Sequence, residues 1–324
     1  MSIAFANEVT VWIVGATLAA LLAAALAIGV LSAAGKISVP LRHELWLRLG
    51  SWCGLFPVMI VPVLLGREWT IAAVTLLSLA CYREYARATG LFRERLLSLA
   101  VVLGLLAANF AALDNWYGFY VALWPLTASI LAIVSIPQDR PAGYIQRVAL
   151  AVFAYMLFGA GLSHLSFMAN DPGYRPIILL LLTTVALNDV AAFTAGKLIG
   201  GPKLLPATSP NKTISGALGA VAVTTLVVTL LGGALFEGTV LSFAPWLILL
   251  GLLVSVAGQA GDLMLSSIKR DLGIKDMGVV LPGHGGILDR FNSLLLVSPI
   301  IFHLVHYVIG LGTGQPTRLI TGGG

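Results

Sequence analysis

Charged side chains are scarce in this 324-residue sequence. Only 10% of the residues are Asp, Glu, Lys or Arg, whereas 58% are hydrophobic and the mean hydropathy is +0.96. Because a soluble globular domain carries about 25% charged residues, this composition excludes an ordinary soluble protein. It predicts an all-α, polytopic integral membrane protein whose apolar runs form one helical bundle.

Cysteine pairs and several common catalytic motifs are also missing. Cys53 and Cys81 are the only cysteines, and both lie in apolar runs without a Cys-x-x-Cys pattern, so the sequence supports neither a zinc site nor a disulfide framework. It contains no P-loop motif and no Gly-x-Ser-x-Gly nucleophile elbow. The first ten residues carry Glu8 but no Lys or Arg, unlike the basic start of a signal peptide. We therefore expect the first apolar run to be retained as a membrane helix.

The apolar runs predict about ten membrane spans. The third run is short, so residues 50–82 are open to two interpretations, either two spans or one re-entrant hairpin. We interpret residues 1–170 as a transmembrane scaffold and 171–324 as the catalytic half of one integrated membrane domain. Segments 35–48 and 83–97 mix Arg and Glu with apolar residues, and we favour surface anchoring over a lipid entry path for both. The expected spans lie near 9–34, 50–66, 70–82, 95–113, 117–136, 147–168, 176–196, 214–235, 243–264 and 293–312.

The positions of Lys and Arg orient these spans. With ten spans and the N-terminus outside, all but three of the 19 cations fall on the cytoplasmic side; the exceptions are Arg67, Arg175 and Arg318. A hairpin at 50–82 would spoil this asymmetry, which favours ten spans. The net charge of +5 follows from the same loops, which lack a soluble module and interleaved aromatic residues, so we expect no nucleic-acid partner.

The densest polar stretch is residues 258–292. Asp262, Ser266 and Lys269 stand at i, i+4 and i+7, which places them on one face of a helix, with Arg270 beside them. Pro282 and three nearby glycines then end the helix, and successive N–H groups in such a turn can form an anion-binding nest. A divalent cation held by Asp262 and Asp289 among these basic residues would suit a polyphosphate. The stretch predicts a phosphoryl-transfer centre.

A second polar site interrupts the apolar segment 177–195. Asn188 and Asp189 lie about two turns before its end. A carboxylate at membrane depth costs about 3 kcal/mol on insertion scales, so we expect this pair to face a cavity, a partner or a metal, with an interhelical hydrogen bond as the alternative. The following loop carries Lys197, Lys203 and Lys212 among glycines and prolines, and on its own it is only a weak indication of a phosphate-binding loop.

Two motifs together resemble a known family. The run Ser266-x-x-Lys269-Arg270, Lys275-Asp276-x-Gly278, Pro282-Gly283-His284-Gly285-Gly286 and Asp289-Arg290 resembles the signature of the phosphatidate cytidylyltransferases. Asn188-Asp189-x-x-Ala192-Phe193-x-x-Gly196-Lys197, followed by Ser209-Pro210-Asn211-Lys212-Thr213, is similar to the second recognisable segment of that family. The resemblance covers roughly residues 185–295.

The resemblance implies a membrane nucleotidyltransferase of phospholipid biosynthesis. It would join CTP to phosphatidate or a similar lipid phosphate, forming CDP-diacylglycerol and pyrophosphate, with Mg²⁺ held by Asp262 and Asp289. We expect a bacterial inner-membrane protein whose active site faces the cytoplasm; a homodimer is left open. The expected catalytic residues are Asp262, Ser266, Lys269, Arg270, Asp289 and Arg290. The expected substrate-binding residues are Asn188, Asp189, Lys197, Ser209, Lys212, Thr213, Lys275, Asp276, Gly283, His284, Gly285 and Gly286.

The sequence departs from the family pattern at two positions. Asn292 stands where the family usually has an acid, and Ser215 stands where it usually has a glutamate. Two alternatives therefore stay open. One is a related CTP-dependent transferase acting on another lipid phosphate or a prenyl alcohol. The other is a transporter or non-catalytic membrane protein that uses Asp189 and Asp262 as ion-pathway residues. We assign His303 and His306, in the last span, to packing.

Overall fold

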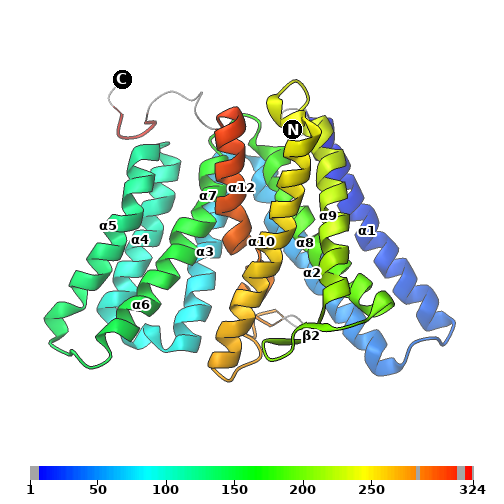
Figure 1. Ribbon diagram of the computed structural model, residues 1–324, viewed down its shortest axis with the longest axis horizontal. Coiled ribbons are helices and arrows are strands. Elements are labelled where there is room, and N and C mark those ends of the chain that lie inside the picture. The colour runs from blue at the N-terminus through cyan, green and yellow to red at the C-terminus, as the bar shows by residue number, and fades with distance from the viewer. Residues whose placement is uncertain (1–6, 282–284, 312–317, 323–324) are drawn as a thin grey trace.

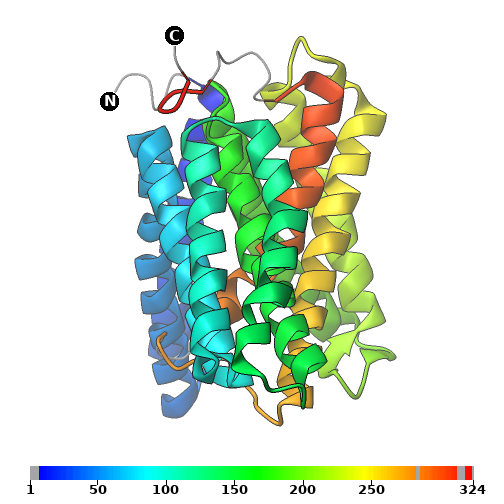
Figure 2. The same cartoon turned by 90° about the vertical axis from the view of Figure 1, so that its left-hand side faces the viewer.

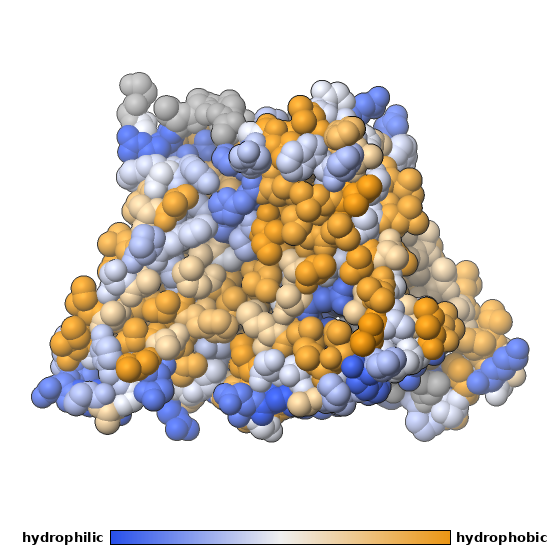
Figure 3. All heavy atoms as spheres, viewed as in Figure 1, coloured by the Kyte–Doolittle hydropathy of each residue, from blue (hydrophilic) through white to orange (hydrophobic). Residues whose placement is uncertain are grey.

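The structure is a computed structural model that describes residues 7–281, 285–311 and 318–322. Long helices run between two opposite faces of the molecule (Figure 1). The view turned by 90° shows the same upright arrangement (Figure 2). On the surface, an apolar band lies between polar rims, as expected for a bundle that crosses a membrane (Figure 3). The predicted all-α membrane bundle is confirmed.

The first half of the chain supplies helices α1 to α7, and η3 is a π-helical segment between α6 and α7. These elements are α1 (Glu8–Ala33), α2 (Val39–Leu65), α3 (Arg67–Thr89), η1 (Leu91–Arg93), α4 (Arg95–Leu113), α5 (Tyr117–Val134), η2 (Ile136–Gln138), α6 (Tyr144–Ala154), η3 (Tyr155–Gly161) and α7 (Leu162–Met168).

The second half contains the longest helix and a small antiparallel hairpin, in which Lys203 pairs with Thr213 and Leu205 with Ser209. The elements are α8 (Tyr174–Ile199), β1 (Lys203–Leu205), β2 (Ser209–Thr213), α9 (Ile214–Leu235), η4 (Val240–Ser242), α10 (Ala244–Asp271), α11 (Leu288–Phe291) and α12 (Leu294–Ile309).

Residues 50–82 form two long helices instead of a re-entrant hairpin. Within the described residues, nine helical segments are long and apolar enough to cross a membrane, and α3 is absent from that set. α3 nevertheless has 23 residues, or about 35 Å of helix at 1.5 Å per residue, which exceeds the roughly 30 Å hydrocarbon core. α1 begins and α12 ends on one face, as an even number of crossings requires (Figure 1). Ten passages therefore account for the described chain.

The boundaries of α3 correct the interpretation of residues 83–97 as one surface segment. Residues 83–89 continue the buried helix, which ends at Gly90 in a left-handed conformation with φ of 78°. Glu84 and Tyr85 are both buried, at 6% and 1% exposure. The cluster of Arg and Glu in the sequence therefore marks the C-terminal end of α3. Segment 35–48 is also not a separate surface helix, because its residues from Val39 onward form the first turns of α2.

Glycines allow the helices of the second half to approach closely around the lower end of the bundle. A Cβ on Gly261 of α10 would lie 2.7 Å from the carbonyl oxygen of Asn292, and one on Gly216 of α9 would lie 2.5 Å from the carbonyl oxygen of Ala192 in α8. Such contacts between backbones require glycine and are typical of membrane helix packing. They bring Asp262, which follows Gly261, next to Asn292.

Candidate functional site

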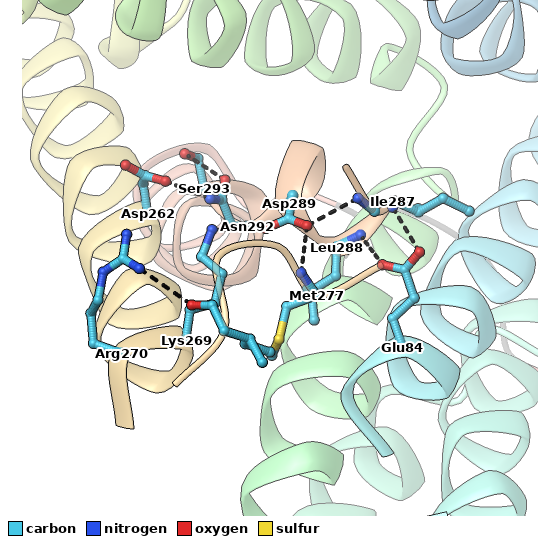
Figure 4. A network of polar contacts seen from close by, with 12 residues as sticks. Glu84, Asp262, Lys269, Arg270, Met277, Ile287, Leu288, Asp289, Asn292 and Ser293 are labelled. Atoms are coloured by element: carbon cyan, nitrogen blue, oxygen red, sulfur yellow. Dashed lines mark hydrogen bonds and ion pairs between the residues drawn. The ribbon is translucent and has the colours of Figure 1, made fainter. Parts of the chain in front are cut away.

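Polar side chains from five elements gather at the lower end of the bundle. α3, α8, β2 and α10 contribute residues that lie far apart in the sequence, together with the segment 274–293 that connects α10 to α12. Figure 4 shows the part of this site centred on Asp289, with Glu84 on one side and Asp262 on the other. The site lies on the face where the β-hairpin is found (Figure 1).

Asp289 holds the Gly-rich loop and orients Lys269. Its side chain is 1% exposed, and its Oδ1 accepts a hydrogen bond from Lys269 Nζ at 2.8 Å. Its Oδ2 accepts hydrogen bonds from the backbone N–H groups of Met277 at 2.8 Å and Gly286 at 3.0 Å. Because these donors come from both arms of the loop, the carboxylate fixes the loop as well as the lysine (Figure 4).

Asp262 is the more accessible carboxylate. About a quarter of its side chain is exposed, and its Oδ2 forms an ion pair with Lys212 Nζ at 2.5 Å. Its Oδ1 accepts a hydrogen bond from Asn292 Nδ2 at 2.6 Å. Lys212 comes from β2, so the hairpin delivers a cation to the end of α10. The structure thus brings Lys212 and Asp262, both predicted site residues, into direct contact.

Asn188 and Asp189 have different roles although they are neighbours. Asn188 is 1% exposed, and its Oδ1 accepts hydrogen bonds from Thr224 Oγ1 at 3.1 Å and Ser255 Oγ at 2.5 Å. For Asn188 the interhelical hydrogen bond is therefore the correct interpretation. Asp189 instead lines a cleft, close enough to Asp262 for the two negative charges to interact, with Lys212 and Arg290 nearby.

This cleft has apolar walls and a charged end. α2 and α8 provide most of its walls, and α11 and the start of α12 provide the rest. Its polar lining residues are Asp189 and Arg290, the latter exposed to solvent. Its walls include Trp52, Leu55, Met59, Leu182 and Leu294.

Other predicted residues lie at the edge of the site. Arg270 donates from Nε to the carbonyl oxygen of Thr208 at 3.4 Å and from Nη1 to that of Ile274 at 3.3 Å, so it ties the hairpin to the α10 end. Lys197 lies over the ring of Phe193, 5.8 Å from its centroid. Ser266 lies half-buried on α10, and Ser209 pairs with Leu205 in the hairpin. Lys275 and Asp276 are exposed. Gly283 and His284 lie outside the described residues.

The Gly-rich turn binds anions, but those of the protein itself. The N–H group of Gly286 points to Asp289, and the N–H groups of Ile287 and Leu288 point to Glu84, at 2.9 and 2.8 Å. For the described part of the turn, this corrects the expectation that these amides are offered to a ligand. These three amides are therefore already satisfied within the protein.

Sequence reasoning missed Glu84. It lies in α3, 203 residues before Ile287, and no motif connects the two positions. The one available signal was an acidic residue next to aromatic and apolar neighbours in the stretch 81–86, which is unfavourable unless the carboxylate is satisfied. The first half of the chain therefore contributes directly to the site.

The two departures from the family pattern have clear positions. Asn292 lies in the site through its hydrogen bond to Asp262. Ser215 Oγ donates to the carbonyl oxygen of Gly200 and lies 3.1 Å from Thr213 Oγ1, which caps α9 by accepting from the Gly216 N–H group. Ser215 thus fixes the base of the hairpin that carries Lys212. The hairpin begins at Gly200 and Gly201, whose φ values of 70° and 98° favour glycine.

The structure is a polytopic membrane bundle in which lysines pair with aspartates at one end of the helices. The chain matches the model of the cytidylyltransferase family over residues 46–308, and it belongs to that family. This confirms the resemblance seen in the motifs. The protein is therefore a nucleotidyltransferase, and family membership implies CTP as the donor and a phosphate-bearing lipid as the acceptor.

Curated relatives support the assignment. The chain is 32% identical over 271 residues to the uncharacterized protein YnbB of Escherichia coli (strain K12), a match that covers 82% of this chain and 88% of that one. It is 41% identical over 150 residues to the phosphatidate cytidylyltransferase of Brucella suis biovar 1 (strain 1330), covering 45% of this chain and 54% of that one. For the enzyme of the same name from Rickettsia bellii (strain RML369-C), identity is 36% over 193 residues, covering 53% and 84%. The match thus spans about half of the Brucella enzyme and most of the other two.

Proposed function

We propose that this protein transfers the cytidylyl group of CTP to phosphatidate, forming CDP-diacylglycerol and releasing pyrophosphate. The observation that carries this proposal is the cleft beside the charged site, which combines apolar walls with an exposed arginine. A lipid phosphomonoester has the same two parts, an apolar chain and an anionic headgroup. The Brucella and Rickettsia relatives are named phosphatidate cytidylyltransferases, which agrees with this acceptor.

The cleft suits the lipid acceptor. Trp52, Leu55 and Met59 from α2 offer apolar surface to an acyl chain that reaches the cleft from the membrane. Arg290 at the charged end carries a planar guanidinium, which binds a phosphate through two parallel hydrogen bonds. Asp189, which also lines the cleft near Arg290, would repel a phosphate and so favours a position of the phosphate on the arginine.

The lysines suit the triphosphate of CTP. Lys212 and Lys269 lie in ion pairs with Asp262 and Asp289, and each ammonium has donors beyond the one used in its pair. Lys269 comes from the end of α10 and Lys212 from the hairpin, so the two cations reach the site from different elements. We assign both to the phosphates of CTP.

The carboxylates fit a magnesium ion in their donor chemistry. The described residues contain no group of three or more His, Cys, Asp or Glu side chains placed to hold a metal. Mg²⁺, however, is usually held by one or two carboxylates together with substrate phosphates and water. Asp262 and Asp289 would hold it as the sequence predicts, with Asp189 as a further oxygen donor near Asp262. When bound, the ion would stabilise negative charge on the transferred and leaving phosphates.

The reaction needs little acid–base help from the protein. An oxygen of the lipid phosphate attacks the α-phosphorus of CTP, a new O–P bond forms, and the bond from the α-phosphorus to the bridging oxygen breaks, so pyrophosphate leaves with that electron pair. Because the lipid phosphate is already anionic near neutral pH, we assign no general base. The chain contributes by positioning the two phosphates in line and by balancing their charge.

We further propose that the site faces the cytoplasm of a bacterial inner membrane. The loops and helix ends on the face that carries the site hold all but three of the 19 Lys and Arg residues. Basic loops remain on the cytoplasmic side during membrane insertion. CTP is available on that side.

The test is cytidylyl transfer by the purified protein with Mg²⁺ and radiolabelled CTP. Phosphatidate is compared with lysophosphatidate, a prenyl phosphate and a prenyl alcohol, and both labelled lipid and pyrophosphate are measured. We expect equimolar CDP-diacylglycerol and pyrophosphate with phosphatidate. Transfer to another acceptor, with none to phosphatidate, would overturn the acceptor assignment. Arg290→Ala should lower transfer, whereas Lys36→Gln, in the exposed turn between α1 and α2, is the matched control.

A further inference from the structure

Glu84 occupies an unusual position for a carboxylate in a membrane bundle. It lies in α3, is 6% exposed, and faces the loop that joins α10 to α12 (Figure 4). A buried carboxylate is costly unless its oxygens accept hydrogen bonds. Glu84 Oε1 accepts from the N–H group of Ile287 at 2.9 Å, and Oε2 accepts from that of Leu288 at 2.8 Å. Both oxygens therefore grip the backbone at the start of α11.

The loop is shaped to fit this carboxylate. A Cβ on Gly278 would lie 2.5 Å from Glu84 Oε1, and a Cβ on Gly286 would collide with Glu84 Oε2. Two glycines from the two arms of the loop thus enclose one side chain from the first half of the chain. Because neither φ value is positive, the requirement for glycine at 278 and 286 comes from space around Glu84 and not from backbone conformation.

The residue next to those bound by Glu84 is bound by Asp289. The N–H groups of Ile287 and Leu288 bind Glu84, and the N–H group of the preceding Gly286 binds Asp289 Oδ2. Asp289 Oδ1 in turn accepts from Lys269 at 2.8 Å. A continuous chain of hydrogen bonds and backbone therefore runs from Glu84 to the lysine that we assign to CTP.

From this geometry we propose that Glu84 is a positioning residue for cytidylyl transfer. It acts through residues 286–289 to set the places of Asp289 and Lys269. This inference rests on the proposed site, but not on the identity of the lipid acceptor. Since Lys269 and Asp289 act on the charge that develops during transfer, a small displacement of the loop should lower kcat more than it weakens binding of either substrate.

Glu84→Gln tests the proposal most directly. The side chain keeps its size, but its NH2 group faces a backbone N–H donor, so at least one of the two hydrogen bonds is lost. We expect kcat to fall by about 10- to 100-fold, because a displacement of about 1 Å near the chemistry can cost that much. KM for CTP and for the lipid should change less than threefold. Glu94→Gln is the matched control, since Glu94 forms long ion pairs with Arg140 and Arg147, at 3.8 and 3.9 Å.

A second variant pair keeps the proposal testable if Glu84→Gln does not fold. Glu84→Asp draws the carboxylate back by one methylene, which weakens its grip but makes room for a methyl group on Gly278. We expect Gly278→Ala and Glu84→Asp each to lower kcat, and the double variant to lose less than the product of the two effects, because the residues touch.

The acceptor in these assays is whichever lipid phosphate the wild-type protein converts, so a wrong acceptor assignment leaves the test of Glu84 intact. Wild-type kcat in Glu84→Gln would overturn the proposal. A rise of KM for CTP as large as the fall in kcat would also overturn it, because the variant would then weaken substrate binding as much as turnover. Losses of kcat in the double variant equal to the product of the two single losses would overturn it as well, because Glu84 and Gly278 would then act independently. Thermal unfolding in detergent is measured for every variant, so that only folded protein is compared.

Discussion

The amide of Asn292 donates a hydrogen bond of 2.6 Å to Oδ1 of Asp262. An amide can donate to this carboxylate, whereas an unprotonated carboxylate at position 292 would repel it. The Oδ1 atom of Asn292 is also engaged, because it accepts from the N–H group of Ser293 at 2.7 Å. Asn292 thus stabilises the Asp262 carboxylate and leaves the site one negative charge short of the usual family pattern.

Asn292→Asp should therefore make the protein more dependent on a cation. Without Mg²⁺, two carboxylates would face each other, so we expect a lower Tm in EDTA. With Mg²⁺, the added charge should strengthen the pull on the ion, so half-maximal turnover should need less Mg²⁺ or favour phosphatidate over other acceptors. Magnesium titrations of turnover and Tm measure both effects. Ser215→Glu and the double variant complete the comparison, and identical curves for all four proteins would mean that neither position tunes the site.

Asp262→Asn and Asp289→Asn should separate catalysis from stability. We expect both to lower turnover by at least about 100-fold, because each removes a charge expected to hold the metal. Asp262 is partly exposed, so its variant should unfold near the wild-type Tm. Asp289 is buried and pairs with Lys269, and breaking a buried pair costs about 3–5 kcal/mol, so its variant should be much less stable. Turnover and Tm are compared with those of Asp271→Asn, an exposed control on α10, the helix that carries Asp262. Near-normal turnover in both variants would contradict the metal assignment.

The location of the site could be predicted from sequence because its motifs lie next to long apolar runs. Asp262 and Lys269 follow the apolar part of α10, and hydropathy and the distribution of basic residues placed both on the same face as Lys212. The partners could not be predicted. Lys212 binds Asp262, and Glu84 binds Leu288 across 204 residues, and nothing local in the sequence encodes such contacts.

Adjacent polar residues show a second limit of sequence reasoning. Successive residues on a helix point about 100° apart, so neighbours such as Asn188 and Asp189 can face different surroundings. Asn188 turns towards α9 and α10, where Thr224 and Ser255 bind it, and Asp189 turns towards the cleft. The motif indicated that both residues matter, but only the packing of α8 against its neighbours separates their roles. The length of α3 could not be predicted either, because its polar last turns made the apolar run look shorter than the helix.

Lys269→Ala should lower kcat/KM by a factor that corresponds to about 2–4 kcal/mol, because it removes a cation from the transferred phosphate and leaves Asp289 without its partner. Lys269→Arg should restore little activity, since the Lys269 side chain is only 12% exposed and a planar guanidinium differs in shape from a compact ammonium. Steady-state kinetics at saturating lipid give the comparison. Full activity in Lys269→Arg would indicate that only bulk charge is needed.

The hydrogen bonds of Asp114, far from the site, predict that the stability of the folded protein depends on pH. Burial raises the pKa of this carboxyl, but hydrogen bonds from the Thr321 hydroxyl and the N–H groups of Ile320 and Thr321, with Arg318 nearby, outweigh burial and lower it below its ordinary value. A lowered pKa means that Asp114 stabilises the folded state above the ordinary carboxyl pKa of about 3.9, and that this contribution is lost as the pH falls through the lower folded value.

The expected result is that Asp114→Asn releases residues 318–322 at neutral pH. Trypsin should then cut after Arg318 faster than in the wild type, whose Arg318 lies 4.9 Å from the ring of Trp116. The difference in Tm between the two proteins should be constant from pH 8 to about pH 5 and should shrink at lower pH. Asp139→Asn, in an exposed turn on the opposite face, is the control. Equal cleavage rates would show that Asp114 does not hold this segment.

The position of the cleft predicts that its residues bind the lipid acceptor and not CTP. Arg290 and Met59 line the cleft, whereas Lys212 and Lys269 lie in the paired charges beside it. Arg290→Ala should raise KM for the lipid acceptor by at least about 10-fold, since a charge-assisted hydrogen bond contributes roughly 1.5–3 kcal/mol, and should leave KM for CTP within a factor of two.

Met59→Trp should fill the apolar part of the cleft and raise KM for long-chain phosphatidate more than for a short-chain analogue. Val58→Trp, on the exposed side of the same helix, is the matched control and should change neither value. If Arg290→Ala instead raised KM for CTP alone, the cleft would belong to the nucleotide, and the lipid would have to reach the site from another side of the bundle.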